Sequence, residues 1–143
     1  MTNPTAEMLV IGDEILSGRT RDANMYYLSG ALTKIGIDLK EVRVVSDDKA
    51  AIIAAVTALS AAHDTVITSG GIGPTHDDIT ADCIAAAFDH PIDIRSDARA
   101  LLAAYYDRQG IELNAARLRM ARIPDGATLI DNPVSVAPGF TLE

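Results

Sequence analysis

Cysteine is nearly absent from this chain, which has a single one, Cys83, in 143 residues. One cysteine can form no internal disulfide and no cysteine-rich zinc site. Cys83 lies in an expected helix over residues 81–88 with no cation nearby, which is typical of core packing. No stretch approaches the ~20 apolar residues of a spanning helix, and no basic leader opens the sequence. We therefore expect a cytoplasmic protein that does not enter a membrane.

Positive charge is also scarce. Twelve Lys and Arg residues stand against twenty Asp and Glu residues, so the formal net charge is −8. Nonspecific nucleic-acid binding depends on Lys and Arg that neutralise phosphates, so this balance argues against a nucleic-acid partner. Hydrophobic residues make up 48% of the chain and charged residues 22%, as in a folded globular protein. We expect one domain with one hydrophobic core over residues 1–143.

The hydrophobic pattern in the first two thirds of the chain predicts strands that alternate with helices. We expect strands and helices in the order 7–11 (strand), 22–35 (helix), 39–45 (strand), 49–62 (helix), 65–68 (strand) and 81–88 (helix). Thr80 is expected to cap the last of these helices. This order specifies a parallel sheet with right-handed crossovers. We therefore predict an α/β fold, a three-layer sandwich with a mostly parallel sheet and helices on both faces.

The pattern changes after residue 90. We expect helices over residues 97–109 and 115–122, and short strands over 92–94, 127–130 and 140–142. The sequence stops just after the last expected strand begins, which is an unusual place for a terminus. We therefore expect the native chain to continue beyond Glu143.

The third expected strand leads directly into the run SGGIGPTHDDIT, residues 69–80. Glycines let backbone amides approach an anion closely, and the start of the next helix adds unpaired donors. Asp77 and Asp78 would repel a bare phosphate, so the run indicates either phosphate with Mg²⁺ or carboxylates that bind a heterocycle. A tight turn with no ligand is the simpler alternative. The run has no P-loop lysine, and His76 stands where the dinucleotide fingerprint needs glycine.

In a parallel sheet the turns after successive strands meet at one edge. The carboxylates that follow the three expected strands are therefore expected to converge there: Asp13, Glu14, Asp47, Asp77 and Asp78. Asp13 and Glu14 either bind a metal or a pterin ring, or are only acidic turn residues. Asp47 and Asp48 have a similar alternative, because a helix start favours a carboxylate as its cap.

Four segments of the chain resemble one known family. They are IGDEILSGRT at residues 11–20, VVSD at 44–47, the glycine run at 69–80, and Asn132-Pro133 followed by APGF at 137–140. Together they resemble the molybdopterin-binding (MoCF) domain family, and most closely the N-terminal domain of the competence/damage-inducible protein A (CinA) group.

This resemblance implies that the glycine loop and the neighbouring strand ends hold a phosphorylated pterin. Asp47 and Asp78 match the two functional aspartates of the molybdopterin adenylyltransferases, so the resemblance implies that both are catalytic. We expect Asp77 and Asp78 to bind Mg²⁺ or another divalent metal. The expected ligand-binding residues are Gly12, Asp13, Glu14, Ser17, Gly18, Ser69, Gly70, Gly71, Gly73, Pro74, Thr75, Thr80, Pro138 and Gly139.

The resemblance leaves more than one function open. The first is molybdopterin binding by a CinA-type domain, in the setting of molybdenum cofactor biosynthesis. The second is a metal-dependent pyrophosphatase that splits a nucleotide diphosphate such as ADP-ribose, and the third is a molybdopterin adenylyltransferase. His76 and Asp77 stand where the adenylyltransferases commonly carry basic residues, which weakens the third. Ser135 stands where the family usually has glycine. Members of the family usually self-associate, so the resemblance also implies a homo-oligomer, either a dimer or a trimer.

Overall fold

A computed structural model describes residues 2–143, which fall into two units. The first unit ends at Gly70, and the second runs from Gly71 to Glu143. The glycine run is therefore divided, because Ser69 and Gly70 belong to the first unit and its other residues to the second. Within the described residues, no helix has both the length and the apolar character that crossing a bilayer requires.

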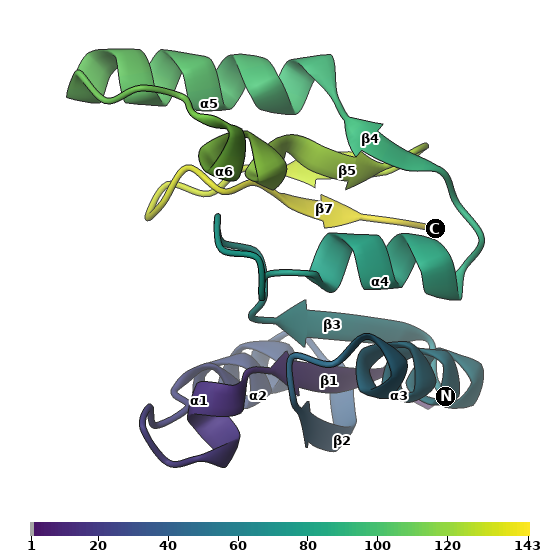
Figure 1. Ribbon diagram of the computed structural model, residues 1–143. Helices are drawn as coiled ribbons and strands as arrows, with labels where there is room; N and C mark the ends of the chain where they lie inside the picture. Colours follow the sequence, from purple (N-terminus) through teal and green to yellow (C-terminus); the bar gives the residue numbers. More distant parts are fainter. Residues whose placement is uncertain (1) are drawn as a thin grey trace. The chain divides into compact units, whose positions relative to one another are not determined.

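The first unit is built on a parallel sheet of three strands in the order β2-β1-β3 (Figure 1). The strands are β1 (Thr5–Ile11), β2 (Asp38–Val45) and β3 (Thr65–Ser69). β1 is the central strand and is buried from Ala6 to Ile11, which accounts for its nearly unbroken apolar sequence. The predicted parallel sheet is confirmed.

Two helices connect these strands, α2 (Asn24–Lys34) and α3 (Lys49–Ala62). The first crossover runs from β1 to β2 and the second returns past β1 to β3, so right-handed crossovers place the helices on opposite faces. Figure 1 agrees, with α3 in front of the sheet and the fainter α2 behind it. The predicted three-layer α/β arrangement is therefore confirmed.

The second unit consists of four helical segments and two antiparallel strand pairs. The helical segments are α4 (Thr80–Ala87), α5 (Ser96–Gln109), α6 (Ala115–Leu118) and the short 3-10 helix η1 (Arg119–Ala121). β4 (Ile92–Ile94) pairs with β5 (Arg122–Pro124), and β6 (Thr128–Ile130) pairs with β7 (Gly139–Thr141).

Three local predictions were wrong. A four-residue helix, α1 (Asp13–Leu16), lies between the first expected strand and the first expected helix, where no helix was expected. Thr80 is not the cap of α4 but its first residue; it is 1% exposed, and its amide donates to the carbonyl of Gly71 at 3.2 Å. The helix expected over residues 115–122 is α-helical only to Leu118; the 3-10 helix η1 follows to Ala121, and Arg122 belongs to the strand pair β4-β5.

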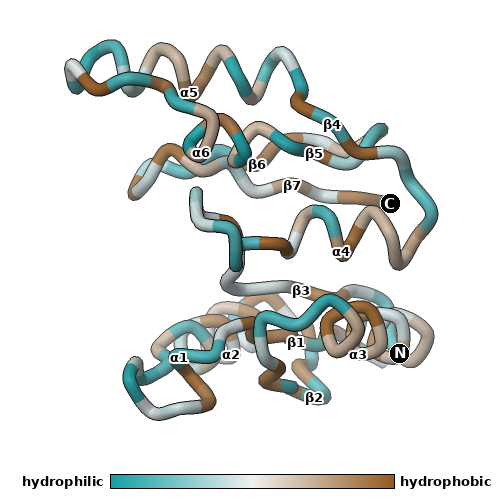
Figure 2. Tube along the Cα trace, in the orientation of Figure 1, coloured by the Kyte–Doolittle hydropathy of each residue, from teal (hydrophilic) through white to brown (hydrophobic). Residues whose placement is uncertain are grey.

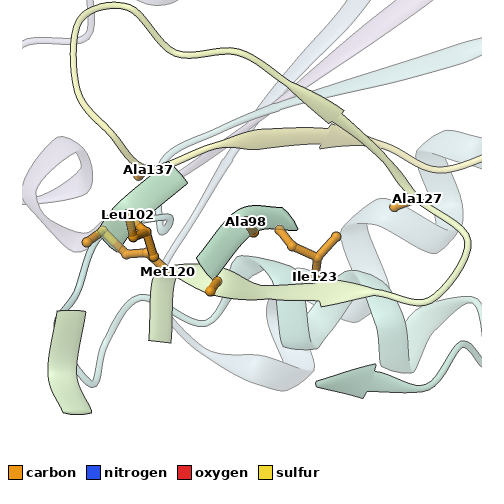
Figure 3. Close-up of a cluster of buried hydrophobic side chains, with 7 residues drawn as sticks. Ala98, Leu102, Met120, Ile123, Ala127 and Ala137 are labelled. Carbon is orange, nitrogen blue, oxygen red and sulfur yellow. The ribbon is translucent and has the colours of Figure 1, made fainter. Parts of the chain in front are cut away.

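Small and medium apolar side chains form the core of the second unit (Figure 3). They are Ala98, Leu102, Met120, Ala121, Ile123, Ala127 and Ala137. Along α5, which supplies two of them, hydrophobic and hydrophilic residues alternate in the manner of a surface helix (Figure 2). Just before α5, the Arg95 guanidinium donates to both oxygens of Asp97 at 2.9 Å and lowers the pKa of that carboxyl to about 2.

Candidate functional site

The C-terminal ends of β1 and β2 are joined by two aspartates that hydrogen-bond each other's backbone. The amide of Asp13 donates to Oδ2 of Asp47 at 3.1 Å, and the amide of Asp47 donates to Oδ1 of Asp13 at 3.2 Å. Asp13 is exposed and Asp47 half-buried. Each carboxylate therefore keeps one oxygen available to a ligand. The structure brings these two predicted residues together at the sheet edge.

The end of β3 completes this edge. Gly70 has a φ of 99°, and a Cβ atom placed there would lie 2.0 Å from the carbonyl oxygen of Ile11. The strand ends are therefore so close that only glycine fits. Ser69 accepts a hydrogen bond at 2.7 Å from the side-chain amide of Asn24, a residue at the start of α2 that carried no signal in the sequence. We call Gly12, Asp13, Asp47, Ser69 and Gly70 the sheet-edge site.

Three further predicted residues, Glu14, Ser17 and Gly18, follow Asp13 in the chain and make local contacts or shape the turn. The carboxylate of Glu14 folds back toward Gly12, where an added Cβ would lie 2.5 Å from its Oε1 atom. The hydroxyl of Ser17 donates to the carbonyl of Glu14 at 3.3 Å and accepts from Nε of Arg19 at 3.1 Å. Gly18 follows with a φ of 78°, so it shapes the turn after α1.

In the second unit, Asp78 closes the glycine loop on itself. Its Oδ2 atom accepts from the amide of Thr75 at 2.9 Å and from the Thr75 hydroxyl at 2.8 Å. A Cβ added at Gly73 would lie 2.7 Å from the same oxygen, so glycine makes room for this carboxylate. Thr75, Gly73 and Asp78 thus form one structured turn.

The other acidic residue of the loop has a different partner. Asp77 is largely exposed, and its carboxylate lies 3.2 Å from Nε2 of His76. Within residues 2–143, no three His, Cys, Asp or Glu side chains gather closely enough to hold a metal ion. The assignment of Asp77 and Asp78 as metal ligands therefore stays a prediction.

A small pocket of about 20 Å³, enough for a water-sized group, lies beside the glycine loop. Its lining combines Gly71, Ile72, Gly73 and Asp78 with Ala81, Asp82, Arg119, Met120, Arg122, Ile123, Pro138 and Phe140. Arg122 pairs with Asp82 at 2.7 Å, and this contact raises the pKa of Arg122. Of the two residues predicted in the last turn, Pro138 lines this pocket, and Gly139 begins β7.

Arg119 and Arg122 are the functional candidates that sequence reasoning missed. The loop itself carries no Lys or Arg, and the predicted site residues include no basic side chain. The structure brings both arginines to it from the segment between α6 and β5. The only available signal was the pair of arginines in RMAR at residues 119–122.

The segment 132–138 is organised by the side chain of Asn132. Its Oδ1 atom accepts from the amides of Val134 and Ser135 at 3.2 and 3.1 Å, and its Nδ2 atom donates to the Ser135 hydroxyl and the Ala137 carbonyl at 2.9 Å. Ser135, which stands where the family usually has glycine, is therefore held by its hydroxyl inside this turn.

Residues 7–143 match the family described as "Probable molybdopterin binding domain". The chain belongs to this family. A protein of Metallosphaera sedula is 39% identical over 96% of the chain and 52% of its own length. A CinA-like protein of Citrifermentans bemidjiense is 39% identical over 94% of the chain and 33% of its own length. The chain spans about half the length, or less, of these curated relatives.

Two solved structures are similar to this chain. The crystal structure of CinA from Thermoplasma acidophilum, a protein described as having unknown function, superposes with a TM-score of 0.87. It is 35% identical, and the match covers 96% of this chain and 80% of that one. MoaB of Pyrococcus furiosus, described as a tungsten cofactor synthesizing protein, has a TM-score of 0.58 at 21% identity and 93% coverage of this chain, 77% of its own, so it shows the fold alone. The resemblance to the MoCF family and to CinA is confirmed.

Proposed function

We propose that this molybdopterin-binding family member binds a phosphorylated pterin of the molybdopterin type, and that the sheet-edge site recognises its ring. The observation that carries the proposal is the pair of carboxylates from Asp13 and Asp47, fixed by each other's backbone amides at 3.1 and 3.2 Å. A pterin ring presents an amino group and ring N–H groups, which are hydrogen-bond donors that carboxylates accept strongly. The family description, which names molybdopterin binding, supports the same ligand class.

The fixed geometry of the pair is what suits it to recognition. One oxygen of each aspartate accepts a hydrogen bond from the partner's backbone amide, so both carboxylates are already ordered. Ligand binding therefore costs less conformational entropy at these side chains. Asp48, the next residue after Asp47, has a different role: its Oδ2 atom caps α3 by accepting a hydrogen bond from the amide of Ala51 at 2.9 Å. The two neighbouring aspartates thus have separate tasks, and we infer that Asp47 serves the ligand and Asp48 the helix.

Asp47→Asn is expected to weaken binding of molybdopterin, kept under anaerobic conditions, by about tenfold or more, because the hydrogen bonds to ionised acceptors are lost. The measurement is a titration followed by pterin fluorescence. Asp48→Asn is the matched control: it removes the same charge one residue away, and asparagine caps helices well, so affinity should stay within about twofold. Equal affinity for wild type and Asp47→Asn would contradict the proposal, as would a wild type that binds no pterin.

Metal-dependent hydrolysis of a nucleotide diphosphate is the second candidate. The same two carboxylates favour it, because Mg²⁺ is commonly held by one or two carboxylates together with substrate phosphates. Asp13 and Asp47 are the residues that would hold the ion, which when bound neutralises charge on the phosphates.

This second candidate predicts turnover of ADP-ribose when the protein is incubated with Mg²⁺, Mn²⁺ or Co²⁺, measured as release of AMP. Turnover should fall at least about a hundredfold in Asp47→Asn and remain in Asp48→Asn. The same assay tests the catalytic role predicted for Asp78 through Asp78→Asn. Tight pterin binding without any turnover would reject the hydrolase, and full activity in both Asp47→Asn and Asp78→Asn would remove both residues from its mechanism.

A further inference from the structure

A second hollow in the second unit lies between the glycine loop and α6. Its volume is about 730 Å³, within the range of about 300–1,000 Å³ typical of small-molecule sites. It is lined by Pro74, Thr75, His76, Asn114, Ala115, Ala116, Arg117 and Arg119, and we call it the arginine groove. Two arginines and no carboxylate line it, although the chain as a whole has a net charge of −8. This local reversal of charge is the first sign of an anionic ligand.

Arg119 is the arginine of the groove whose guanidinium has no polar partner among the described residues. Arg95 pairs with Asp97 and Arg122 with Asp82. Arg119 is half-buried, yet in the described part of the chain no carboxylate lies within ion-pairing distance of it and its side chain makes no hydrogen bond. Withdrawing a cation partly from water without a partner is unfavourable, so the unfilled position fits a ligand that brings its own negative charge.

The neighbours of Arg119 are arranged to support it. Arg117 is held by a hydrogen bond from its Nη1 atom to the carbonyl of Glu112 at 2.8 Å, and its guanidinium lies 5.5 Å from the centre of the Tyr106 ring. Asn114 uses its Oδ1 atom to accept from the amide of Arg117, which leaves its two N–H donors available. The groove therefore presents a fixed second cation and a neutral donor beside Arg119.

Arg119 also lines the small pocket, together with Gly71, Gly73 and Asp78 of the glycine loop. Its planar guanidinium offers forked N–H donors that match two oxygens of one phosphate. Arg119 thus supplies the cation that the loop lacks in its own sequence.

We propose that the arginine groove binds the phosphate group of a small molecule, with Arg119 as its main contact and Arg117 and Asn114 as supporting donors. This site goes beyond the proposed recognition of a pterin ring at the sheet edge, and it does not depend on it. The ligand class is a phosphate or diphosphate ester, whose source is either a phosphorylated pterin or a nucleotide.

Isothermal titration with inorganic pyrophosphate, without metal and at low salt, tests the groove directly. Arg119→Ala should weaken binding about tenfold or more, and Arg119→Lys should restore only part of it, because lysine keeps the charge but not the fork. Arg108→Ala is the matched control: Arg108 is exposed in the last turn of α5, and its removal changes the net charge equally. Affinity in that control should stay within about twofold, and urea unfolding should show that every variant is folded.

Two results would overturn the proposal: a wild type that binds no pyrophosphate, or the same loss of affinity in Arg119→Ala and Arg108→Ala. The groove and the sheet-edge site are tested with different ligands and different variants, pyrophosphate with Arg119→Ala and molybdopterin with Asp47→Asn, so failure of one can be told apart from failure of the other. Parallel titrations with phosphorylated pterin and with ADP identify the source. A lower affinity of Arg119→Ala for either ligand would support the proposal and identify that ligand as the source of the phosphate. Unchanged affinity for both ligands would count against the proposal.

Discussion

Alanine at position 70 is expected to lower the free energy of unfolding by about 3 kcal/mol or more. Gly70 has a φ of 99°, a conformation that L side chains rarely adopt, and an added Cβ would lie 2.0 Å from the carbonyl oxygen of Ile11. Ile11 is 1% exposed at the end of the central strand, so neither backbone can move without separating β3 from β1. Urea denaturation followed by circular dichroism measures the loss.

Gly30→Ala is the control, because it is expected to raise the free energy of unfolding where Gly70→Ala lowers it. Gly30 lies inside α2, and nothing lies within 4 Å of an added Cβ there. Alanine should raise the free energy of unfolding by about 0.5–1 kcal/mol, because it restricts the unfolded chain and favours the helix. An unchanged urea midpoint for Gly70→Ala would show that the strand ends are not as close as described.

The second large effect is expected at the other end of β1. Glu7 is 0% exposed in the central strand, and its Oε1 atom lies 2.7 Å from Nε2 of His63, just after α3. The two carboxylate oxygens have no other hydrogen-bond partner within the described residues. His63→Ala should lower the free energy of unfolding by about 3 kcal/mol, because removing one partner leaves an uncompensated buried charge. Urea denaturation at neutral pH measures it.

A double variant separates this cause from simple loss of packing. Glu7→Gln combined with His63→Ala removes the charge as well as its partner, so the combined loss should be smaller than the sum of the single losses. His90→Ala is the control for removing an imidazole, since the half-buried ring of His90 has one hydrogen-bond partner among the described residues, the carbonyl of Asp125 at 2.9 Å. Strict additivity in the Glu7 and His63 cycle would argue that the two side chains do not interact.

Local patterns predicted most of the first unit, because the signals there are short in range. The bounds of α3, Lys49–Ala62, were predicted to the residue from the cap at Asp48 and the buried spacing of Ile52, Val56 and Leu59. The parallel order of strands and helices also predicted that Asp13 and Asp47 meet at one edge of the sheet, as they do.

Contacts between distant residues account for what the sequence did not predict. Arg122 was expected to end a helix, but it pairs with Asp82, 40 residues earlier, and takes part in β5. Asn24 meets Ser69 across 45 residues, and no local pattern marks either as a partner. Glu7 was predicted in a buried strand, but nothing in the sequence indicated that His63 would contact its carboxylate. The cations beside the glycine loop were missed for the same reason, since periodicity describes one element at a time.

The position of Glu7 has a practical consequence. The buried contact between Glu7 and His63 lies at the start of β1, whereas Asp13 and Asp47 lie beyond the end of the strand. Buried ion pairs are often no more stabilising than well-packed apolar side chains of similar volume. A more heat-resistant variant of this chain can therefore be sought by replacing Glu7 and His63 with leucine or methionine, while Asp13 and Asp47 at the other end of the strand stay unchanged.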